Sequence, residues 1–272
     1  STRLICVNGS DEELNYNRAA DELLLSDPGA FLQNLMDIEK NWSEWFNLQS
    51  RRREHWVKEW SDHIDAETLR DNRIHPLQLS LDVQKEMNEE DWLVFDGGNT
   101  HFWSEIAVNI AGWKGQRLGG IMHPGNYSLL GVGVSFGISA KNLNPDKNVV
   151  VISGDGAFLS GGLSIEAAFQ EGLPITVVID NNGGLDCISQ QQERLFSNGK
   201  HFATDFRDIP FHTMFEGLGG YGELVTKREE IGPALKRAIA SGKTACLNVK
   251  CKGVISPIVA ATSDKRDKAS IE

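Results

Sequence analysis

Side chains suited to holding a metal ion follow two apolar runs in the middle of the chain. Asp155 lies within the triplet GDG directly after the run VVVIS, and Asn182 follows the run ITVVID in the sequence NNGG. Carboxylate, amide and main-chain carbonyl oxygens are the hard ligands that Mg²⁺ takes, and its remaining positions go to water and substrate phosphates. The glycines beside Asp155 allow the backbone to approach a ligand closely. The pattern therefore predicts a Mg²⁺–diphosphate site.

Two parallel strands are expected to position these residues. The runs Val149–Ile152 and Ile175–Ile179 consist of β-branched residues, which is typical of strands buried on both faces of a parallel sheet. The segment between them is long enough for a helix with the usual right-handed crossover, so both strands end at the same edge, where α/β folds bind ligands. We expect the glycine-rich turn that enters this helix from Ser160 to offer N–H groups to phosphates.

This segment also carries a family resemblance. GDG, a spacer of 24 residues and then NN resemble the signature of thiamine diphosphate (ThDP) enzymes. In that family the Asp of GDG, the second Asn and a backbone carbonyl two residues later hold Mg²⁺, which here implies Asp155, Asn182 and Gly184. GDG alone also fits a plain βαβ unit with two tight turns, but that reading does not account for both motifs at this spacing. The resemblance assigns further cofactor contacts to Gly154, Gly156, Ala157 and Phe158.

A second glycine-rich turn, DGGNT, follows the predicted strand WLVF. It resembles the turn of acetolactate synthase-like and 2-hydroxyacyl-CoA lyase-like enzymes that contacts the diphosphate end of ThDP. The resemblance implies this role for Gly98, Asn99 and Thr100. Taken by itself, the motif also fits an ordinary Gly-Gly turn.

A third glycine pattern lies in the stretch SLLGVGVSFG. Its pattern Gly131-x-Gly133-x-x-x-Gly137 permits a dinucleotide fingerprint, and so a nicotinamide-dependent dehydrogenase as another class of function. That motif requires a strand directly before it, whereas residues 123–128 are turn-like, so we interpret Gly133 and Gly137 as sites where a helix packs closely on the sheet. In ThDP enzymes a large apolar residue before this glycine supports the bent cofactor, and a nearby carbonyl accepts a hydrogen bond from its aminopyrimidine. The resemblance gives these roles to Leu130 and Ser128.

The residues after Asn182 depart from part of the family. Many decarboxylating relatives have an aromatic residue at the position of Leu185, and pyruvate decarboxylases have a glutamate at the position of Ile188; both are apolar here. This argues against a pyruvate-decarboxylase-type proton relay and leaves the acceptor chemistry open. Asp186 is expected to stabilise a turn, with a substrate contact as the alternative. The polar segment 189–212 is expected to form an irregular loop over the active site.

Composition argues against several other classes of function. The 272 residues carry a net charge of −11 with a pI near 5.2, so nucleic acid is a poor partner. No apolar run is long enough to span a membrane, and the first residues do not resemble a signal peptide. Four scattered cysteines without a CxxC pair suit reduced thiols, so a cytoplasmic protein is expected.

Four parts are expected along the chain. The first resembles the end of the central domain of ThDP enzymes, because it contains the strand RLICVN and a helix that begins near Asp27-Pro28. One strand and one helix cannot bury a core alone, so we expect the carboxyl half of a longer architecture. The parts are residues 1–45, the central-domain fragment; 46–73, a helical linker; 74–252, the ThDP diphosphate-binding domain; and 253–272, a polar tail or lid.

Together these features predict an α/β fold with a doubly wound parallel sheet and one subunit of a two-chain, Mg²⁺-dependent ThDP enzyme. In the family, the glutamate that hydrogen-bonds the pyrimidine ring lies in a separate pyrimidine-binding domain, and no such domain fits in these residues. We expect a second subunit to carry that domain and most of the central domain, in a heterotetramer or larger assembly. Alone, this chain should be inactive, since it places only Leu130 and Ser128 beside the reacting part of the cofactor.

The expected reaction makes or breaks a C–C bond next to a carbonyl of a small 2-oxo or 2-hydroxyacyl substrate. The DGGNT turn favours a 2-hydroxyacyl-CoA lyase-like or acetolactate synthase-like enzyme. A 2-oxoacid decarboxylase subunit is the alternative within this class, and a non-catalytic, cofactor-binding regulatory subunit is the alternative outside it. Arg51–Arg53 is expected to be a solvated face, with a coenzyme A phosphate site as the other reading.

Overall fold

The computed structural model describes residues 3–14, 19–36, 41–70, 73–196 and 200–261, which form two compact units, Ser1–Trp56 and Val57–Glu272. The boundary between them lies within a long helix, α2 (Ser43–Arg70). This helix covers most of the segment 46–73, for which we expected a helical linker. The domain limits drawn from the sequence stay a prediction.

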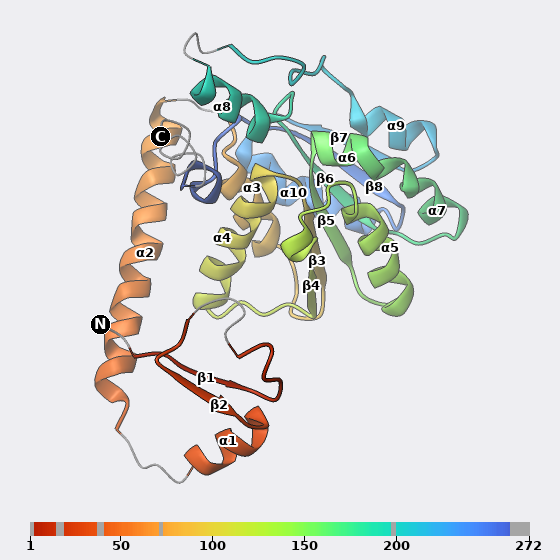
Figure 1. Cartoon of the computed structure of the whole chain (residues 1–272). Helices are drawn as coiled ribbons and strands as arrows, with labels where there is room; N and C mark the ends of the chain where they lie inside the picture. The colour runs from red at the N-terminus through yellow and green to blue at the C-terminus, as the bar shows by residue number, and fades with distance from the viewer. Residues whose placement is uncertain (1–2, 15–18, 37–40, 71–72, 197–199, 262–272) are drawn as a thin grey trace. The chain divides into compact units, whose positions relative to one another are not determined.

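The described part of the first unit contains a small parallel sheet, a short helix and the first turns of α2 (Figure 1). Strand β1 (Ile5–Asn8) pairs with β2 (Glu22–Leu25), and α1 (Pro28–Leu35) follows. Asp27 caps this helix, since its Oδ1 accepts a 2.8 Å hydrogen bond from the Ala30 N–H, and Pro28 occupies the first turn, as predicted. The short strand β2 was not predicted, because ELLL lacks the alternation of a half-buried strand.

The second unit is built on a six-stranded parallel sheet with the strand order β4-β3-β5-β6-β8-β7. The two apolar runs that we expected to be neighbouring parallel strands are β5 and β6, and the register pairs Val150 with Thr176 and Gly154 with Asp180. The strands are β3 (Trp92–Asp96), β4 (Gly120–Met122), β5 (Val149–Gly154), β6 (Thr176–Asn181), β7 (Tyr221–Val225) and β8 (Ala245–Lys250).

Helices cover both faces of this sheet (Figure 1). Along β5, Val150 and Ile152 face one core and Val149 and Val151 face the other, which explains why the strand has no polar face. On the first side lie α3 (Pro76–Lys85), α4 (Asn99–Trp113) and α10 (Ile231–Ala240). On the second side lie α5 (Gly133–Leu143), α6 (Asp155–Gly161), α7 (Ile165–Gln170) and α9 (Phe211–Gly217). The predicted doubly wound α/β fold is confirmed.

The chain changes its direction of travel across the sheet at β3. Strand β4 follows on one side of β3, and β5 then pairs with the other side. Such a switch point opens a crevice at the carboxyl ends of the strands. Asp96 ends β3 and Gly154 ends β5, while Asn181 ends the next strand, β6. The crevice is therefore bordered by the residues to which the sequence assigned chemistry.

Two predicted local structures are wrong. Helix α8 (Asp186–Leu195) occupies the beginning of the segment expected to be an irregular loop. The sequence SQQQERL consists mainly of good helix formers, which favour the observed helix. The polarity of this segment had instead favoured the prediction of a loop. Helix α6 begins at Asp155 itself, so Ser160 lies in its last turn rather than in the turn that enters the helix.

Residues 253–261, the first part of the segment expected to be a polar tail or lid, pack against the domain. Trp103 Nε1 donates to the Val254 carbonyl at 2.9 Å, the Ser256 N–H donates to Asn99 Oδ1 at 2.9 Å, and Val259 is buried. The apolar run VISPIVA determines this packing, and residues 262–272 lie outside the described part of the chain. None of the described helices combines the length and apolarity needed to cross a membrane.

Candidate functional site

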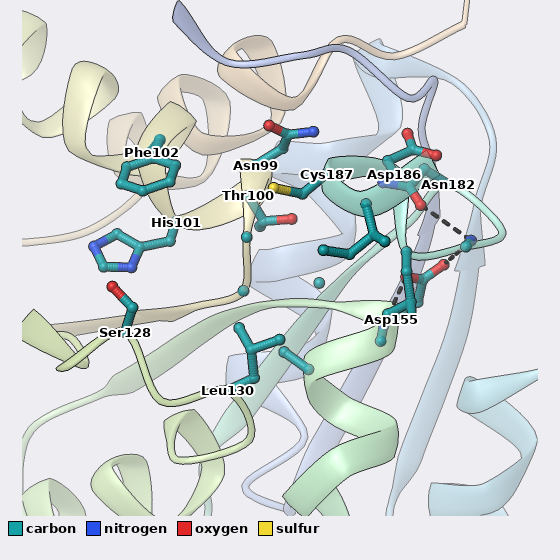
Figure 2. A pocket seen from close by; sticks show the side chains of 18 residues that line it. Asn99, Thr100, His101, Phe102, Ser128, Leu130, Asp155, Asn182, Asp186 and Cys187 are labelled. Atoms are coloured by element: carbon teal, nitrogen blue, oxygen red, sulfur yellow. Dashed lines mark hydrogen bonds between the residues drawn. The ribbon is translucent and has the colours of Figure 1, made fainter. Parts of the chain in front are cut away.

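A pocket opens at the carboxyl ends of β3, β5 and β6 (Figure 2). It brings together most of the residues singled out in the sequence. The predicted site residues that line it are Gly98, Asn99, Thr100, Ser128, Leu130, Gly154, Asp155, Gly156, Ala157, Asn182 and Gly184. Phe158 is the exception, because α6 turns its side chain toward the sheet, where its ring packs 5.5 Å from that of Phe211. The cofactor contact assigned to Phe158 stays a prediction, and the position of its ring does not support one made by the side chain.

The Asp155 carboxylate is buried at the base of this pocket and gathers the turn after β6. Its Oδ2 accepts hydrogen bonds from the N–H groups of Gly183 at 2.8 Å and Gly184 at 3.1 Å, and its Oδ1 accepts one from Gly156 at 2.7 Å. Gly184 also donates to Asn182 Oδ1 at 3.2 Å. A single amide thus holds the oxygen atoms of Asp155 and Asn182 close together, as a shared metal ion requires.

The NNGG turn is held in place by the segment that follows α8. Leu185 N–H donates to the Thr204 carbonyl at 2.8 Å, and Phe206 N–H donates to the Gly183 carbonyl at 2.8 Å. Gly184 is needed here, because a Cβ at this position would lie 2.6 Å from the Thr204 carbonyl oxygen. The third predicted Mg²⁺ ligand is therefore presented by its backbone, on a turn that admits no side chain.

Three carboxyl groups are concentrated beneath the pocket. The pKa of Asp155 is raised to about 6, of Asp180 to about 7 and of Asp186 to about 6. Burial is the main cause for all three, and repulsion from Asp155 contributes to the raised pKa values of Asp180 and Asp186. Among the described residues, Asp180 Oδ1 and Asp186 Oδ2 are buried without a hydrogen-bond partner. A buried excess of negative charge with unsatisfied oxygen atoms favours a bound cation. The donor set fits Mg²⁺, which takes carboxylate, amide and carbonyl oxygens.

The side chains of the DGGNT turn are used to fasten α4 to its neighbours. Thr100 Oγ1 donates to Asp180 Oδ2 at 2.8 Å, and Asn99 Nδ2 donates to Gln190 Oε1 of α8 at 3.1 Å. The Asn99 side-chain oxygen, Oδ1, also accepts a hydrogen bond from the Ser256 N–H. Their side chains therefore shape the pocket, and the diphosphate contact expected of Gly98, Asn99 and Thr100 would fall mainly to their backbone N–H groups.

Asp96 positions the loop that carries Ser128 and Leu130, a role that sequence reasoning missed. Its Oδ2 accepts the N–H groups of Gly131 at 2.9 Å and Gly133 at 2.7 Å. Ser128 has a left-handed backbone, with φ of 49°, which turns the chain at the end of a 3-10 helix. The signal for Asp96 was present, since an acidic residue directly after an apolar strand lies at the ligand-binding edge of the sheet.

The glycines of α5 support close packing, as we predicted. A Cβ on Gly133 would lie 2.7 Å from the Asp96 Cβ, and a Cβ on Gly137 would lie 2.5 Å from Val151 Cγ2. These are helix–sheet contacts, and the residues before the pattern, Gly125–Tyr127, form a 3-10 turn. The dinucleotide reading is therefore disfavoured.

The remaining wall of the pocket was only partly predicted. Leu185 lies over Gly156, where a Cβ would come within 2.4 Å of its Cδ2. Cys187 contributes a half-buried thiol, whose pKa is raised by burial. In the view of Figure 2, His101 and Phe102 of α4 border the side away from Asp155 and Asn182. No sequence motif indicated that His101, Phe102 and Cys187 would line the pocket, because their positions depend on how α4 and α8 meet.

Comparison with known proteins agrees with this geometry. Residues 96–249 match the family described as "Thiamine pyrophosphate enzyme, C-terminal TPP binding domain". The chain is 30% identical over 189 residues to the acetolactate synthase large subunit IlvG of Mycobacterium tuberculosis, covering 68% of this chain and 33% of that protein. It is 27% identical over 242 residues to human 2-hydroxyacyl-CoA lyase 2, covering 85% of this chain and 36% of the relative.

A third relative is similar along nearly the whole chain. Oxalyl-CoA decarboxylase of Escherichia coli is 26% identical over 271 residues, which cover 96% of this chain and 45% of that enzyme. Across these three relatives, the matched region spans from about a third to just under half of the relative's length.

Proposed function

Because the chain belongs to the thiamine pyrophosphate enzymes through its C-terminal cofactor-binding domain, we propose that it binds the diphosphate half of ThDP through Mg²⁺. Asp155, Asn182 and the Gly184 carbonyl would hold the metal. The observation that carries this proposal is the shared Gly184 N–H, which holds the Asp155 and Asn182 oxygens together above a cluster of buried carboxyl groups.

The rest of the pocket would orient the organic part of the cofactor. When bound, ThDP supplies an electron sink for carbanion chemistry next to a carbonyl. Leu130, on the loop that Asp96 holds, would support the bent cofactor by its bulk, and the Ser128 carbonyl would accept a hydrogen bond from the aminopyrimidine. Both residues line the pocket. Leu185 and Ile188 would keep water from the reacting face, because both present apolar side chains there.

The reaction would form or cleave a C–C bond adjacent to the carbonyl of a small 2-oxo or 2-hydroxyacyl substrate. The similarity to an acetolactate synthase and to a 2-hydroxyacyl-CoA lyase supports this class. A 2-oxoacid or oxalyl-CoA-type decarboxylase subunit is the second candidate, favoured by a relative that covers 96% of the chain. The names of two of these relatives, 2-hydroxyacyl-CoA lyase 2 and oxalyl-CoA decarboxylase, favour a coenzyme A thioester as the substrate.

Turnover would require a second chain. It would carry the pyrimidine-binding domain with its glutamate and most of the central domain, in a heterotetramer or larger assembly. The four free cysteines support a reducing, cytoplasmic setting. If a complete assembly bound ThDP without turnover of any 2-oxo acid or 2-hydroxyacyl thioester, the chain would instead be a cofactor-binding regulatory subunit.

A conservative variant tests the metal site directly. Asp155→Asn keeps the size of the side chain and one acceptor for the turn, whereas alanine would remove an acceptor that three N–H groups share. Binding of Mg²⁺ and ThDP to the chain, measured by isothermal titration calorimetry, should weaken at least about tenfold, because a charged metal ligand is lost.

Asp146→Asn is the matched control, because this exposed aspartate also loses one charge but lies outside the pocket. It should bind Mg²⁺ and ThDP like the wild type. Unchanged affinity of Asp155→Asn, with a native circular dichroism spectrum, would contradict the proposal.

A further inference from the structure

A second group of metal-ligating side chains lies apart from the predicted Mg²⁺ ligands. His101 and Glu105 are one turn apart on α4, and His123 follows β4. One ligand atom from each lies within 4.8 Å of the other two. Two imidazoles and one carboxylate form the ligand set of protein zinc sites that keep a position open. We propose that His101, Glu105 and His123 bind a divalent transition metal ion such as Zn²⁺.

Two of the three ligands are already at the spacing that a metal ion needs. His101 Nε2 lies 3.1 Å from Glu105 Oε1. Ligand atoms about 2.1 Å from a zinc ion and 90–110° apart are separated by roughly 3.0–3.4 Å. A metal ion can therefore replace the proton between this pair without moving the helix. His123 has to approach by a small rotation, which its exposed position allows.

Aromatic contacts hold the two imidazole rings beside each other. The ring of His123 stacks on Phe95 with centroids 5.1 Å apart and planes 7° apart, and it meets the ring of His101 edge-on at 5.1 Å. His101 is buried and stacks on Phe102 at 5.2 Å. The Gly125 N–H donates to His123 Nδ1 at 3.2 Å, and because this turn is partly exposed, that donor can bond to water when the ring binds a metal.

The proposed site differs from the Mg²⁺ site in ligands and in place. Nitrogen donors suit zinc, copper and nickel, whereas all-oxygen donors suit Mg²⁺. Figure 2 shows His101 on the side of the pocket away from Asp155 and Asn182. A metal ion here would join α4 to the segment between β4 and Leu130, and so would restrain one wall of the pocket.

Zinc binding to the metal-free full-length chain tests the proposal. Isothermal titration calorimetry with ZnCl₂, in excess Mg²⁺ to occupy oxygen sites, should show binding of one Zn²⁺ ion per chain. His123→Ala and Glu105→Gln should each weaken it at least about tenfold. His123 is exposed, so its removal should leave the circular dichroism spectrum unchanged. With Zn²⁺, hydrogen exchange should slow in residues 121–131 of the wild type but not of His123→Ala.

Two control variants separate this site from adventitious binding. His55→Ala removes an exposed histidine of α2 and should bind Zn²⁺ like the wild type. His201→Ala removes a rival group, since His201 contacts Glu193 and Asp205, and it should also bind normally. The proposal is overturned if the wild type binds no Zn²⁺, if His123→Ala and Glu105→Gln retain its affinity, or if only His201→Ala loses it.

Discussion

At the residue scale, the predicted metal site rests on carboxyl groups that the fold has removed from water. Burial raises the pKa of Asp155 to about 6. Between about pH 4 and pH 6 the folded, metal-free chain therefore holds a proton on Asp155 that the unfolded chain has released. The stability contributed by this group is present below about pH 4 and is lost as the pH rises through 6. Asp180, with a pKa raised to about 7, and Asp186, with a pKa raised to about 6, act in the same direction.

Mg²⁺ and protons therefore compete for Asp155, and we predict that Mg²⁺-dependent ThDP binding weakens as the pH falls below 6. The loss should be about tenfold per pH unit for one displaced proton. The rise in melting temperature on adding Mg²⁺ and ThDP should be larger above pH 7 than at pH 5. A shift that does not change with pH would contradict the prediction, and Asp155→Asn should show little shift at any pH.

At the element scale, the pocket is assembled from strand ends and from the loops tied to them. The acidic residue that ends β3, Asp96, holds the loop entering α5, and the one in β6, Asp180, accepts the hydroxyl of Thr100 at the start of α4. Parallel strands bring these ends to one edge, and each carboxylate then restrains an element from another part of the chain. The positions of Ser128 and Leu130 thus depend on a residue more than 30 positions earlier, Asp96.

We predict that Asp96→Asn loosens this loop and weakens ThDP binding. Replacing a charged acceptor of two N–H groups with a neutral amide should cost about 1–2 kcal/mol of unfolding free energy. Hydrogen exchange should accelerate at the Gly131 and Gly133 amides, and ThDP affinity should fall at least several-fold. Asp146→Asn, the exposed control, should change neither the exchange of these amides nor the ThDP affinity. Unaltered exchange at these two amides would show that Asp96 does not hold the loop.

At the scale of the whole molecule, the pocket has an apolar rim. Tyr127 is 96% exposed and Leu129 is 64% exposed, on the segment before Gly131. Leu163, 74% exposed, lies just beyond Gly161, and a Cβ on Gly131 would lie 2.8 Å from the Gly161 nitrogen, so the two segments adjoin. Exposed apolar groups gathered around a site favour a covering partner, which supports the proposed second chain.

We predict that this chain alone does not turn over 2-oxo acids or 2-hydroxyacyl thioesters, and that a companion chain confers activity. Purification from native cells, followed by mass spectrometry, should recover the companion together with ThDP. Adding it should slow hydrogen exchange in residues 125–131 and 159–163. Turnover by the isolated chain at the rate of the assembly would contradict the prediction.

The sequence by itself determined the sheet core and the turns that border the pocket. The β-branched runs are typical of strands buried on both faces, and polar residues directly after such parallel strands lie at the ligand-binding edge. Asp155 and Asn182 were therefore singled out by local pattern and Gly184 by the family resemblance, and all three line the pocket. The helix packing of Gly133 and Gly137 also followed from local pattern.

Only the tertiary structure decided which side chains complete the site. Asp96 and Asp180 restrain segments far away in the sequence, Phe158 turns into the core, and Val254 and Ser256 bond to residues of α4. His101, Glu105 and His123 meet because β4 pairs with β3 and returns the chain beside α4. Such contacts depend on how the fold brings distant elements together. A sequence pattern reflects only the periodicity and the turns of residues that are close together in the chain.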